Sequence, residues 1–185
     1  MKTDFLLKTL GGCVVLAAIL PVRSAAQVAA PAIQSAQPAS ICSGRAACYE
    51  AGDFVAIMTD FRVSTTNGWK VIDTTLHFQN KTNQPLILGY TEGSAMAIDD
   101  QGNRYGLSGQ ANAVRGIGRI TGNNIDPKFS LPPGGAGDTM FELAWNPGSA
   151  TQGVNFELDL SVREVSALEG HQFSLAGESP LQFRA

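Results

Sequence analysis

The sequence predicts an all-β domain, an antiparallel β-sandwich of about seven to nine strands. Apolar and polar residues alternate along several stretches, which is the period of a strand with one buried face. These stretches are rich in β-branched and aromatic residues, and turn-forming residues separate them. Almost no stretch has the period of a helix. Short strands divided by turns in this way are typical of a sandwich.

The central strand is expected between Trp69 and Asn80. Its buried face holds four residues spaced two apart: Ile72, Thr74, Leu76 and Phe78. A preceding strand is expected over 53–64, and the sequence Thr65-Thr66-Asn67-Gly68 predicts a hairpin that joins the two strands antiparallel. The more apolar parity of that preceding strand comprises Val55, Ile57, Thr59, Phe61 and Val63.

The remaining strands follow in chain order, each bounded by turn formers. We expect them over 86–91, 94–98, 104–107, 138–145 and 153–165, with a last pair, 172–175 and 181–183, at one edge. Residues 153–165 show the best alternation in the chain. There we expect Val154 and every second residue up to Val162 to face the core.

Residues 108–128 interrupt this pattern with four glycines and no sustained period. We interpret them as a long irregular loop with one short helical turn near 111–114, and such loops are usually functional or mobile. Five residues within it form a candidate interaction loop: Arg115, Gly116, Ile117, Gly118 and Arg119. Exposed backbone N–H groups and two guanidinium groups suit a phosphate or carboxylate. The alternative is that the arginines pin the loop to acidic residues such as Asp99, Asp100 or Asp126.

The first 26 residues have the form of a secretory signal peptide. Positive charge precedes an apolar run over 14–20, and small residues precede a predicted cleavage after Ala26. Residues 27–41 are rich in alanine, glutamine, proline and serine and are expected to form a flexible leader. The sandwich domain then occupies 42–185. We therefore expect a periplasmic or secreted protein without a membrane span after signal cleavage.

A lipoprotein cleavage box is the alternative for this end of the chain, because the sequence Leu10-Gly11-Gly12-Cys13 has its form. The apolar run follows Cys13 instead of preceding it, and this order disfavours a lipid anchor.

Removing the 26-residue signal from the 185-residue chain leaves 159 residues, enough for one domain. The signal takes three basic and one acidic residue, so the net charge falls from −3 to −5. Such a chain lacks the basic surface that nucleic acids and anionic lipids require.

Cys42 and Cys48 are the cysteines that remain after signal cleavage, and we expect them to form a disulfide in an oxidising compartment. The loop that they close is short, so the expected stabilisation is about 2 kcal/mol. A redox or metal pair is disfavoured, because the spacing is not C-x-x-C and no histidine is near in sequence.

The residues available disfavour an enzyme and a cofactor. The chain has two histidines, His77 and His171, and both are expected at the surface. No G-x-S-x-G motif occurs, so we predict no catalytic residues. Paired carboxylates for glycoside hydrolysis stay open as an alternative. However, three acidic residues occupy strand positions whose side chains are expected to point to solvent, and they need no catalytic role: Glu142, Glu157 and Asp159.

Two local motifs have simpler interpretations than a binding site. Asp99–Asn103 offers oxygen ligands around a glycine, as calcium requires, but it lacks the spaced acids and the downstream glutamate of an EF-hand. A polar turn uses the same residues, so we predict no metal. The sequence Asn80-Lys81-Thr82 fits the N-glycosylation sequon, which matters only in a eukaryotic secretory pathway. The alanine-rich signal indicates a bacterial protein instead.

Three segments resemble a pattern in small exported bacterial proteins of unknown function: LHFQNKTNQPLILGY, DDQGNRYGL and LPPGGAGDTMFEL. In those proteins the corresponding turns mark an immunoglobulin-like sandwich. The resemblance covers about residues 50–165 and implies that fold, without any catalytic residue. The Cys42–Cys48 pair and the 108–128 loop are not part of the pattern.

We expect a non-enzymatic binding or adaptor module of the bacterial cell envelope. Another envelope protein would contact its sheet edges or the 108–128 loop, because open edges can add a partner strand. The alternative is a small-ligand or polysaccharide-binding domain that stacks its ligand on aromatic side chains. The candidates are Trp69, Tyr90, Tyr105 and Trp145. The sequence specifies neither the partner nor the oligomeric state.

Overall fold

A computed structural model describes residues 40–146, 148, 150–169 and 172–185. The predicted signal peptide and all but the last two residues of the predicted leader lie outside this part. Within it the regular structure is β-strand without an α-helix, which confirms the all-β class. Consequently, the described residues include no apolar helix of the length that a bilayer requires.

Thirteen strands run through the described residues, more than the seven to nine expected. The longer strands are β2 (Phe54–Thr66), β3 (Trp69–Asn80), β4 (Leu86–Thr91), β11 (Ala136–Trp145), β12 (Phe156–Ala167) and β13 (Phe173–Arg184). The shorter strands are β1 (Cys48–Glu50), β5 (Met96–Asp99), β6 (Arg104–Leu107), β7 (Val114–Arg115), β8 (Gly118–Thr121), β9 (Asn124–Ile125) and β10 (Phe129–Leu131). The strands beyond those expected are β1, β7, β8, β9 and β10. They are too brief to show a period in the sequence.

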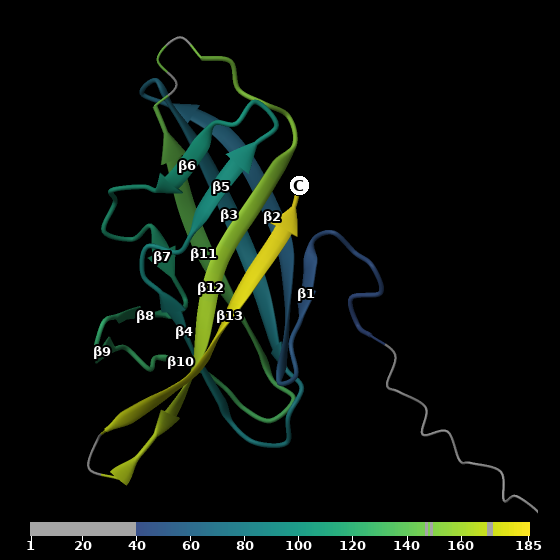
Figure 1. Cartoon of the computed structure of the whole chain (residues 1–185), viewed down its shortest axis with the longest axis vertical. Helices are drawn as coiled ribbons and strands as arrows, with labels where there is room; N and C mark the ends of the chain where they lie inside the picture. The colour runs from purple at the N-terminus through teal and green to yellow at the C-terminus, as the bar shows by residue number, and fades with distance from the viewer. Residues whose placement is uncertain (1–39, 147, 149, 170–171) are drawn as a thin grey trace, which may run out of the picture. The chain divides into compact units, whose positions relative to one another are not determined.

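The sheet folds over on itself into two layers that enclose one core (Figure 1). One layer has the strand order β1-β2-β3-β11, and the other contains β13, β12, β5 and β4. Strand β6 links them, because it pairs with both β11 and β5. Aromatic rings of strands that are not sheet neighbours meet across the core. Tyr90 meets Phe141 and Phe61 meets Phe156, each pair with ring centroids 5.3 Å apart. These contacts make the domain a β-sandwich.

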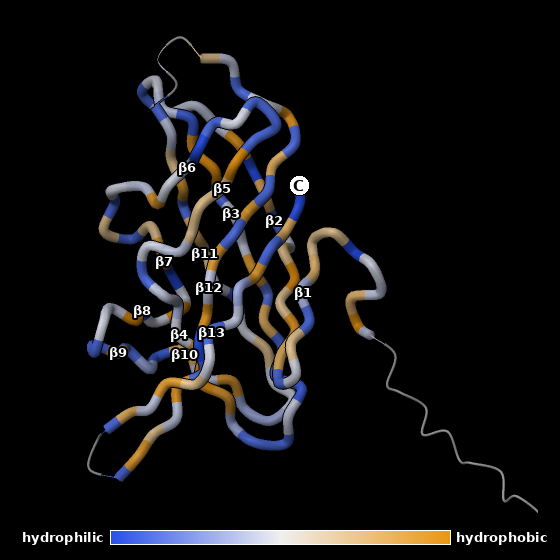
Figure 2. Tube along the Cα trace, viewed as in Figure 1, coloured by the Kyte–Doolittle hydropathy of each residue, from blue (hydrophilic) through white to orange (hydrophobic). Residues whose placement is uncertain are grey.

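The central strand β3 has its predicted bounds and its predicted buried face. Figure 2 shows hydrophobic and hydrophilic residues interspersed along the strands of the domain. Ile72, Leu76 and Phe78 are fully buried, and Thr74 is nearly so. The hairpin to β2 is also as predicted, since Asn67 and Gly68 have φ angles of 51° and 82° and Thr66 pairs with Trp69.

Strand β2 changes its inward parity at a β-bulge. The register with β3 shifts between Met58 and Asp60, which leaves Thr59 as the extra residue. Before the bulge Met58 faces the core, and after it Phe61 and Val63 do. The alternate residues from Val55 to Val63, which are the more apolar set in this strand, therefore face the core as a set only after the bulge.

Strand β12 begins at Phe156, later than predicted, and the expectation for Val154 is wrong, because this side chain is 80% exposed. The backbone N–H groups of Gly153 and Val154 donate hydrogen bonds to the carboxylates of Asp99 and Asp100, at 2.8 and 3.0 Å. These bonds hold the residues before Phe156 in a turn. At the other end of the chain, the predicted pair of short strands is one strand, β13.

Candidate functional site

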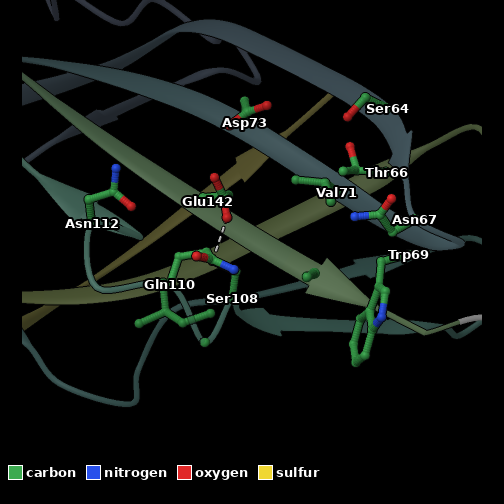
Figure 3. A pocket seen from close by; sticks show the side chains of 13 residues that line it. Ser64, Thr66, Asn67, Trp69, Val71, Asp73, Ser108, Gln110, Asn112 and Glu142 are labelled. Carbon is green, nitrogen blue, oxygen red and sulfur yellow. Dashed lines mark hydrogen bonds between the residues drawn. The ribbon is translucent and has the colours of Figure 1, made fainter.

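A hollow lies on the outer face of strands β2, β3 and β11, the face turned away from the core (Figure 3). Its volume is about 810 Å³, and we call it the first hollow. Thirteen residues line it: Ser64, Thr66, Asn67, Trp69, Val71, Asp73, Leu107, Ser108, Gly109, Gln110, Asn112, Glu142 and Ala144. They come from three strands and from the segment 107–112, so sheet pairing and one connection together build the hollow.

Small side chains form the floor of the first hollow. Val71 of β3 and Ala144 of β11 are direct partners in the antiparallel ladder. They share the outward face, because the inward positions of both strands belong to the core. Trp69 stands beside this floor at the start of β3, and its side chain is 46% exposed. A flat indole surface therefore borders a shallow depression.

The segment 107–112 forms one wall of the hollow and is anchored to β11. The backbone N–H of Ser108 donates to the carbonyl of Glu142 at 2.9 Å, and the N–H of Glu142 donates to the carbonyl of Ala113 at 2.8 Å. The Ser108 hydroxyl also donates to the Glu142 carboxylate at 2.5 Å. These bonds hold the wall in place, whereas Gln110 and Asn112 lie exposed on it.

A second hollow, of about 280 Å³, adjoins the first on the same outer face. Asp73 lines both hollows, so they are neighbours along β3, and we call the two together the outer-face trough. The other residues of the second hollow are Asp60, Arg62, Thr74, Thr75, Arg115, Met140 and Phe141. Arg62 is paired there with Asp60 at 3.0 Å, and Arg115 is exposed.

Two carboxylates stand directly opposite each other in the trough. Asp73 of β3 and Glu142 of β11 are ladder partners, and both lie on the outward parity. Like charges at such positions destabilise a sheet by a few tenths to about 1 kcal/mol. Arg62, the ladder partner of Asp73 on β2, makes its ion pair with Asp60 instead. The hydrogen bond from Ser108 gives Glu142 a structural role, whereas its direct pairing with Asp73 costs stability, and positions that cost stability are often functional.

Three of the four aromatic residues predicted as ligand-stacking candidates belong to the interior. Tyr90 and Tyr105 are fully buried, and Trp145 packs against Tyr105 with ring centroids 5.3 Å apart. Burial and the neighbouring Asp99 raise the pKa of Tyr105. Trp69 is the candidate that remains on the surface, in the first hollow.

The prediction of an irregular loop over 108–128 is wrong, because this segment contains strands β7, β8 and β9. The expected helical turn near 111–114 is a tight turn followed by β7. Ile117 is fully buried in the core. Gly116 and Gly118 allow the backbone to pass close to the carbonyls of Asp138 and Asp126. These glycines therefore serve packing.

The two arginines of the candidate interaction loop differ in their surroundings. Arg119 pairs with Glu92 at 3.5 Å, a partner that the sequence did not suggest. Asp126, which was expected to bind an arginine, pairs with Lys128 at 3.0 Å. Arg115 is exposed and lines the second hollow. Of the five predicted residues, Arg115 is the one that the structure brings to the trough.

The Asp99 carboxylate organises its turn through five hydrogen bonds. Its oxygens accept from the backbone N–H groups of Gln101, Asn103 and Gly153, from the Asn103 amide and from the Tyr105 hydroxyl, at 2.8–3.2 Å. The side chain is only 4% exposed. Its lone pairs are occupied by donors, which fits the turn interpretation better than a calcium ligand. Among the described residues no group of three or more histidine, cysteine, aspartate or glutamate side chains is arranged for a metal ion.

The other predicted motifs are local structural contacts. His77 is partly exposed and shares a 2.7 Å hydrogen bond with Asp138, while His171 lies outside the described residues. Asn80 of the sequon is 1% exposed. Its amide donates to the carbonyls of Gln84, Leu131 and Pro132, so it is a turn anchor and is inaccessible to a glycosyl donor.

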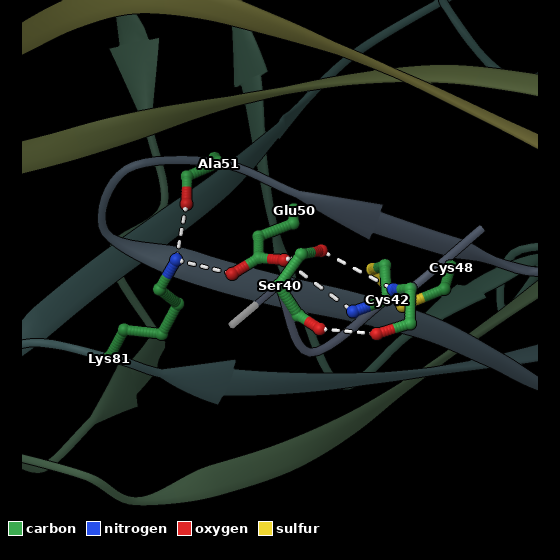
Figure 4. Close-up of a disulfide and its surroundings, with 7 residues drawn as sticks. Ser40, Cys42, Cys48, Glu50, Ala51 and Lys81 are labelled. Atoms are coloured by element: carbon green, nitrogen blue, oxygen red, sulfur yellow. Dashed lines mark hydrogen bonds and ion pairs between the residues drawn. A yellow bond between two sulfur atoms is a disulfide. The ribbon is translucent and has the colours of Figure 1, made fainter. Parts of the chain in front are cut away.

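The predicted disulfide between Cys42 and Cys48 is present and closes a clasp at the start of the domain (Figure 4). Beside it, Glu50 of β1 accepts hydrogen bonds from Lys81 at 2.8 Å and from the Ser40 hydroxyl at 2.6 Å. These two donors, Lys81 first, lower the pKa of Glu50 to about 2. The ion pair ties the clasp to the turn after β3.

Replacing both cysteines with serine is expected to lower the free energy of unfolding by about 2 kcal/mol, because the unfolded chain regains the freedom of the open loop. The domain should still fold, since the Glu50–Lys81 pair and the β1–β2 ladder remain. Urea unfolding of the double variant, with oxidised and reduced wild type beside it, measures the change. Equal unfolding midpoints for the oxidised and reduced protein would contradict this prediction.

Comparisons with known proteins find distantly similar solved structures but assign the chain to no family. No protein-family model matches the sequence, and no curated protein does. The X-ray structure of Northeast Structural Genomics Consortium target SoR45 is 12% identical with a TM-score of 0.41, covering 73% of this chain and 88% of that one. An uncharacterized beta-sandwich protein from Clostridium difficile 630 is 11% identical with a TM-score of 0.37, covering 76% and 90%. Similarities at this level assign no function.

Sequence reasoning missed most of the trough. The outward parity of Asp73 and Glu142 could be read from the strand period, but their cross-strand pairing could not. Gln110 and Asn112 gave no signal, because long-range hydrogen bonds to β11 place their segment. The alternation of β3 and β11, combined with a correct strand pairing, would have brought the two acids together.

Proposed function

We propose that the protein is a non-enzymatic binding module exported to the bacterial cell envelope or beyond it, and that the outer-face trough holds its partner or ligand. The observation that carries the proposal is the pair of facing carboxylates, Asp73 and Glu142, in a hollow beside the exposed Trp69. The Cys42–Cys48 disulfide and the signal-like first 26 residues support export, since disulfides persist in oxidising compartments. The resemblance to exported immunoglobulin-like sandwiches belongs to the same proposal.

The sheet edges are less suited to a partner than the trough. Strand β13 carries a register irregularity opposite Arg163 and Val165, together with Glu178 and Pro180. Bulges, charges and proline are the features that protect edges against strand addition. Near its end, the N–H of Arg184 donates to the carbonyl of Ala46 at 3.0 Å, so the clasp segment borders that part of the edge. We therefore assign the binding role to the outer face.

The lining of the first hollow supports binding without catalysis. None of its thirteen residues is a histidine, cysteine or lysine, so Ser64 and Ser108 have no imidazole or amine base there, and the carboxylates are the remaining candidates for a base. Glu142 is engaged by the Ser108 hydroxyl. Glycosidases also use a pair of carboxylic acids to cleave the glycosidic bond. Each binding experiment on a glycan should therefore include an assay for released reducing ends. The proposal expects no release.

Replacing Asp73 with threonine tests the proposal. The variant removes a like-charge contact and introduces a good strand former, so its stability should equal or exceed that of the wild type by up to about 1 kcal/mol. Retention of the protein on washed bacterial envelopes should nevertheless fall at least about tenfold. Co-sedimentation measures retention, and Leu168→Ala, an exposed apolar truncation outside the trough, is the matched control. Full retention of the threonine variant, or equal losses in both variants, would overturn the proposal.

A further inference from the structure

We infer that the ligand of the outer-face trough is a neutral, linear glycan. The inference rests on the proposed function, since it names the ligand class for the same site. Three properties of the trough carry it: the charges of the first hollow, the presence of an indole beside amide side chains, and the position of the two hollows next to each other along β3.

The charges of the first hollow select against anions. Asp73 and Glu142 are the charged residues among the thirteen that line it, and no lysine or arginine is among them. A phosphate, a nucleic acid or an acidic glycan would be repelled there. Carboxylates accept hydrogen bonds without donating any, so the matching ligand presents O–H or N–H donors.

The uncharged lining has the chemistry that recognises sugar rings. Trp69 offers a flat apolar surface, on which the C–H face of a pyranose can lie. Asn67, Gln110 and Asn112 carry both donors and acceptors, as do the hydroxyl groups around them. A ring hydroxyl is likewise both donor and acceptor. The hollow therefore combines one stacking surface with several groups that can bond to neighbouring hydroxyls.

A cationic peptide is the competing ligand, because Asp73, Glu142 and Trp69 would also suit a lysine or arginine side chain. Two observations favour the glycan. The first hollow contains three amide side chains and two carboxylates. A cationic side chain would pair with the carboxylates and would need few of the amides. In the second hollow, beyond Asp73, Arg62 is paired with Asp60, and the exposed Arg115 would repel a cationic chain laid there.

The length of the trough indicates a chain of sugars. Trp69 and Thr75 lie at its two ends on the same strand, and six residues of extended strand span about 20 Å. One ring on Trp69 would leave the second hollow empty. Affinity is therefore expected to rise from the monosaccharide to the hexasaccharide of the same sugar.

Isothermal titration of the purified protein with neutral linear oligosaccharides tests the inference. The probes are hexasaccharides of β-1,4-glucose, α-1,4-glucose, β-1,4-N-acetylglucosamine, mannose and galactose, each with its monosaccharide. We expect at least one hexasaccharide to bind with a Kd below about 1 mM, at least about tenfold tighter than its monosaccharide. The Kd should change less than about twofold between 50 and 500 mM salt, since no ion pair forms.

Variants connect this binding to the trough. Trp69→Ala should weaken the hexasaccharide at least about tenfold, and Trp69→Phe, which keeps an aromatic surface, by less than about threefold. Leu168→Ala should leave the Kd unchanged. Because Trp69 is an exposed side chain beside a turn, neither change at this position should unfold the domain.

The outcomes separate this inference from the proposed function. No binding by any hexasaccharide, or binding that Trp69→Ala leaves intact, overturns the glycan inference. If Asp73→Thr still abolishes retention on envelopes in that case, the proposed function stands. Salt-sensitive binding of a lysine-rich peptide that requires Asp73 and Trp69 would identify the cationic ligand instead and would equally overturn the inference.

Discussion

Replacing Asp99 with asparagine is expected to lower the free energy of unfolding by about 3–5 kcal/mol, the largest effect that we predict for a single side chain. The carboxylate is buried and accepts five hydrogen bonds, from three backbone N–H groups, the Asn103 amide and the Tyr105 hydroxyl. An amide in its place would point N–H donors at other donors and leave them unsatisfied. Urea unfolding at pH 7 measures the loss, with the exposed Glu178→Gln as the control.

The same variant has a defined pH dependence. Burial raises the pKa of Asp99, but hydrogen bonds from Asn103, Gly153 and Gln101 outweigh it, so the net pKa lies below 3.8. A lowered pKa stabilises the folded state above the unfolded value, and that contribution is lost as the pH falls through the folded pKa. The stability difference between wild type and Asp99→Asn should thus be constant above about pH 5 and shrink below pH 3.8. A difference independent of pH down to 2 would contradict the role given to the ionised carboxylate.

Replacing Gly118 with alanine is expected to destabilise the domain by about 3 kcal/mol. A Cβ atom at this position would lie 1.7 Å from the carbonyl oxygen of Asp126, so one of the two backbones has to move. The neighbouring Ile117 is fully buried, and the displacement would disturb the core. Thermal and urea unfolding measure the effect.

Gly109→Ala is the matched control for this substitution, because its added Cβ would meet no atom within 4 Å. That variant should unfold within about 0.5 kcal/mol of the wild type. Equal stability of Gly118→Ala and Gly109→Ala would show that the 114–121 segment is a free loop after all. The substitution pair thus decides between the sequence-based interpretation of this region and its place in the sandwich.

The spacing of apolar residues was enough to predict those strands whose inward residues form one uninterrupted buried face. Strand β3 has its predicted bounds, because each of its inward residues from Ile72 to Phe78 meets the core without interruption. The bulge at Thr59 was missed, since one inserted residue reverses the parity without any change in composition. Val154 was misplaced for a related reason, because hydrogen bonds to Asp99 and Asp100 hold its neighbourhood in a turn.

The glycine-rich segment shows why the candidate site was harder to predict. Gly116 and Gly118 are compatible with an anion-binding loop or with close backbone packing, and local sequence does not distinguish these roles. The distinction depends on Asp138 and Asp126, whose backbones approach the two glycines only in the folded chain. The trough similarly depends on the pairing of β3 with β11 and on the Ser108–Glu142 contact. Such contacts join residues far apart in sequence.

The measurement that tests the account most directly is an NMR titration of the ¹⁵N-labelled protein with its tightest-binding oligosaccharide. We expect the largest shift changes at the Trp69 indole N–H and at backbone amides of Val71, Asp73, Gln110 and Asn112, which line the first hollow. The Trp145 indole, packed on Tyr105, should stay unchanged. Changes centred on Gly116–Arg119 or along β13, with the Trp69 signal unmoved, would contradict the assignment of binding to the outer face.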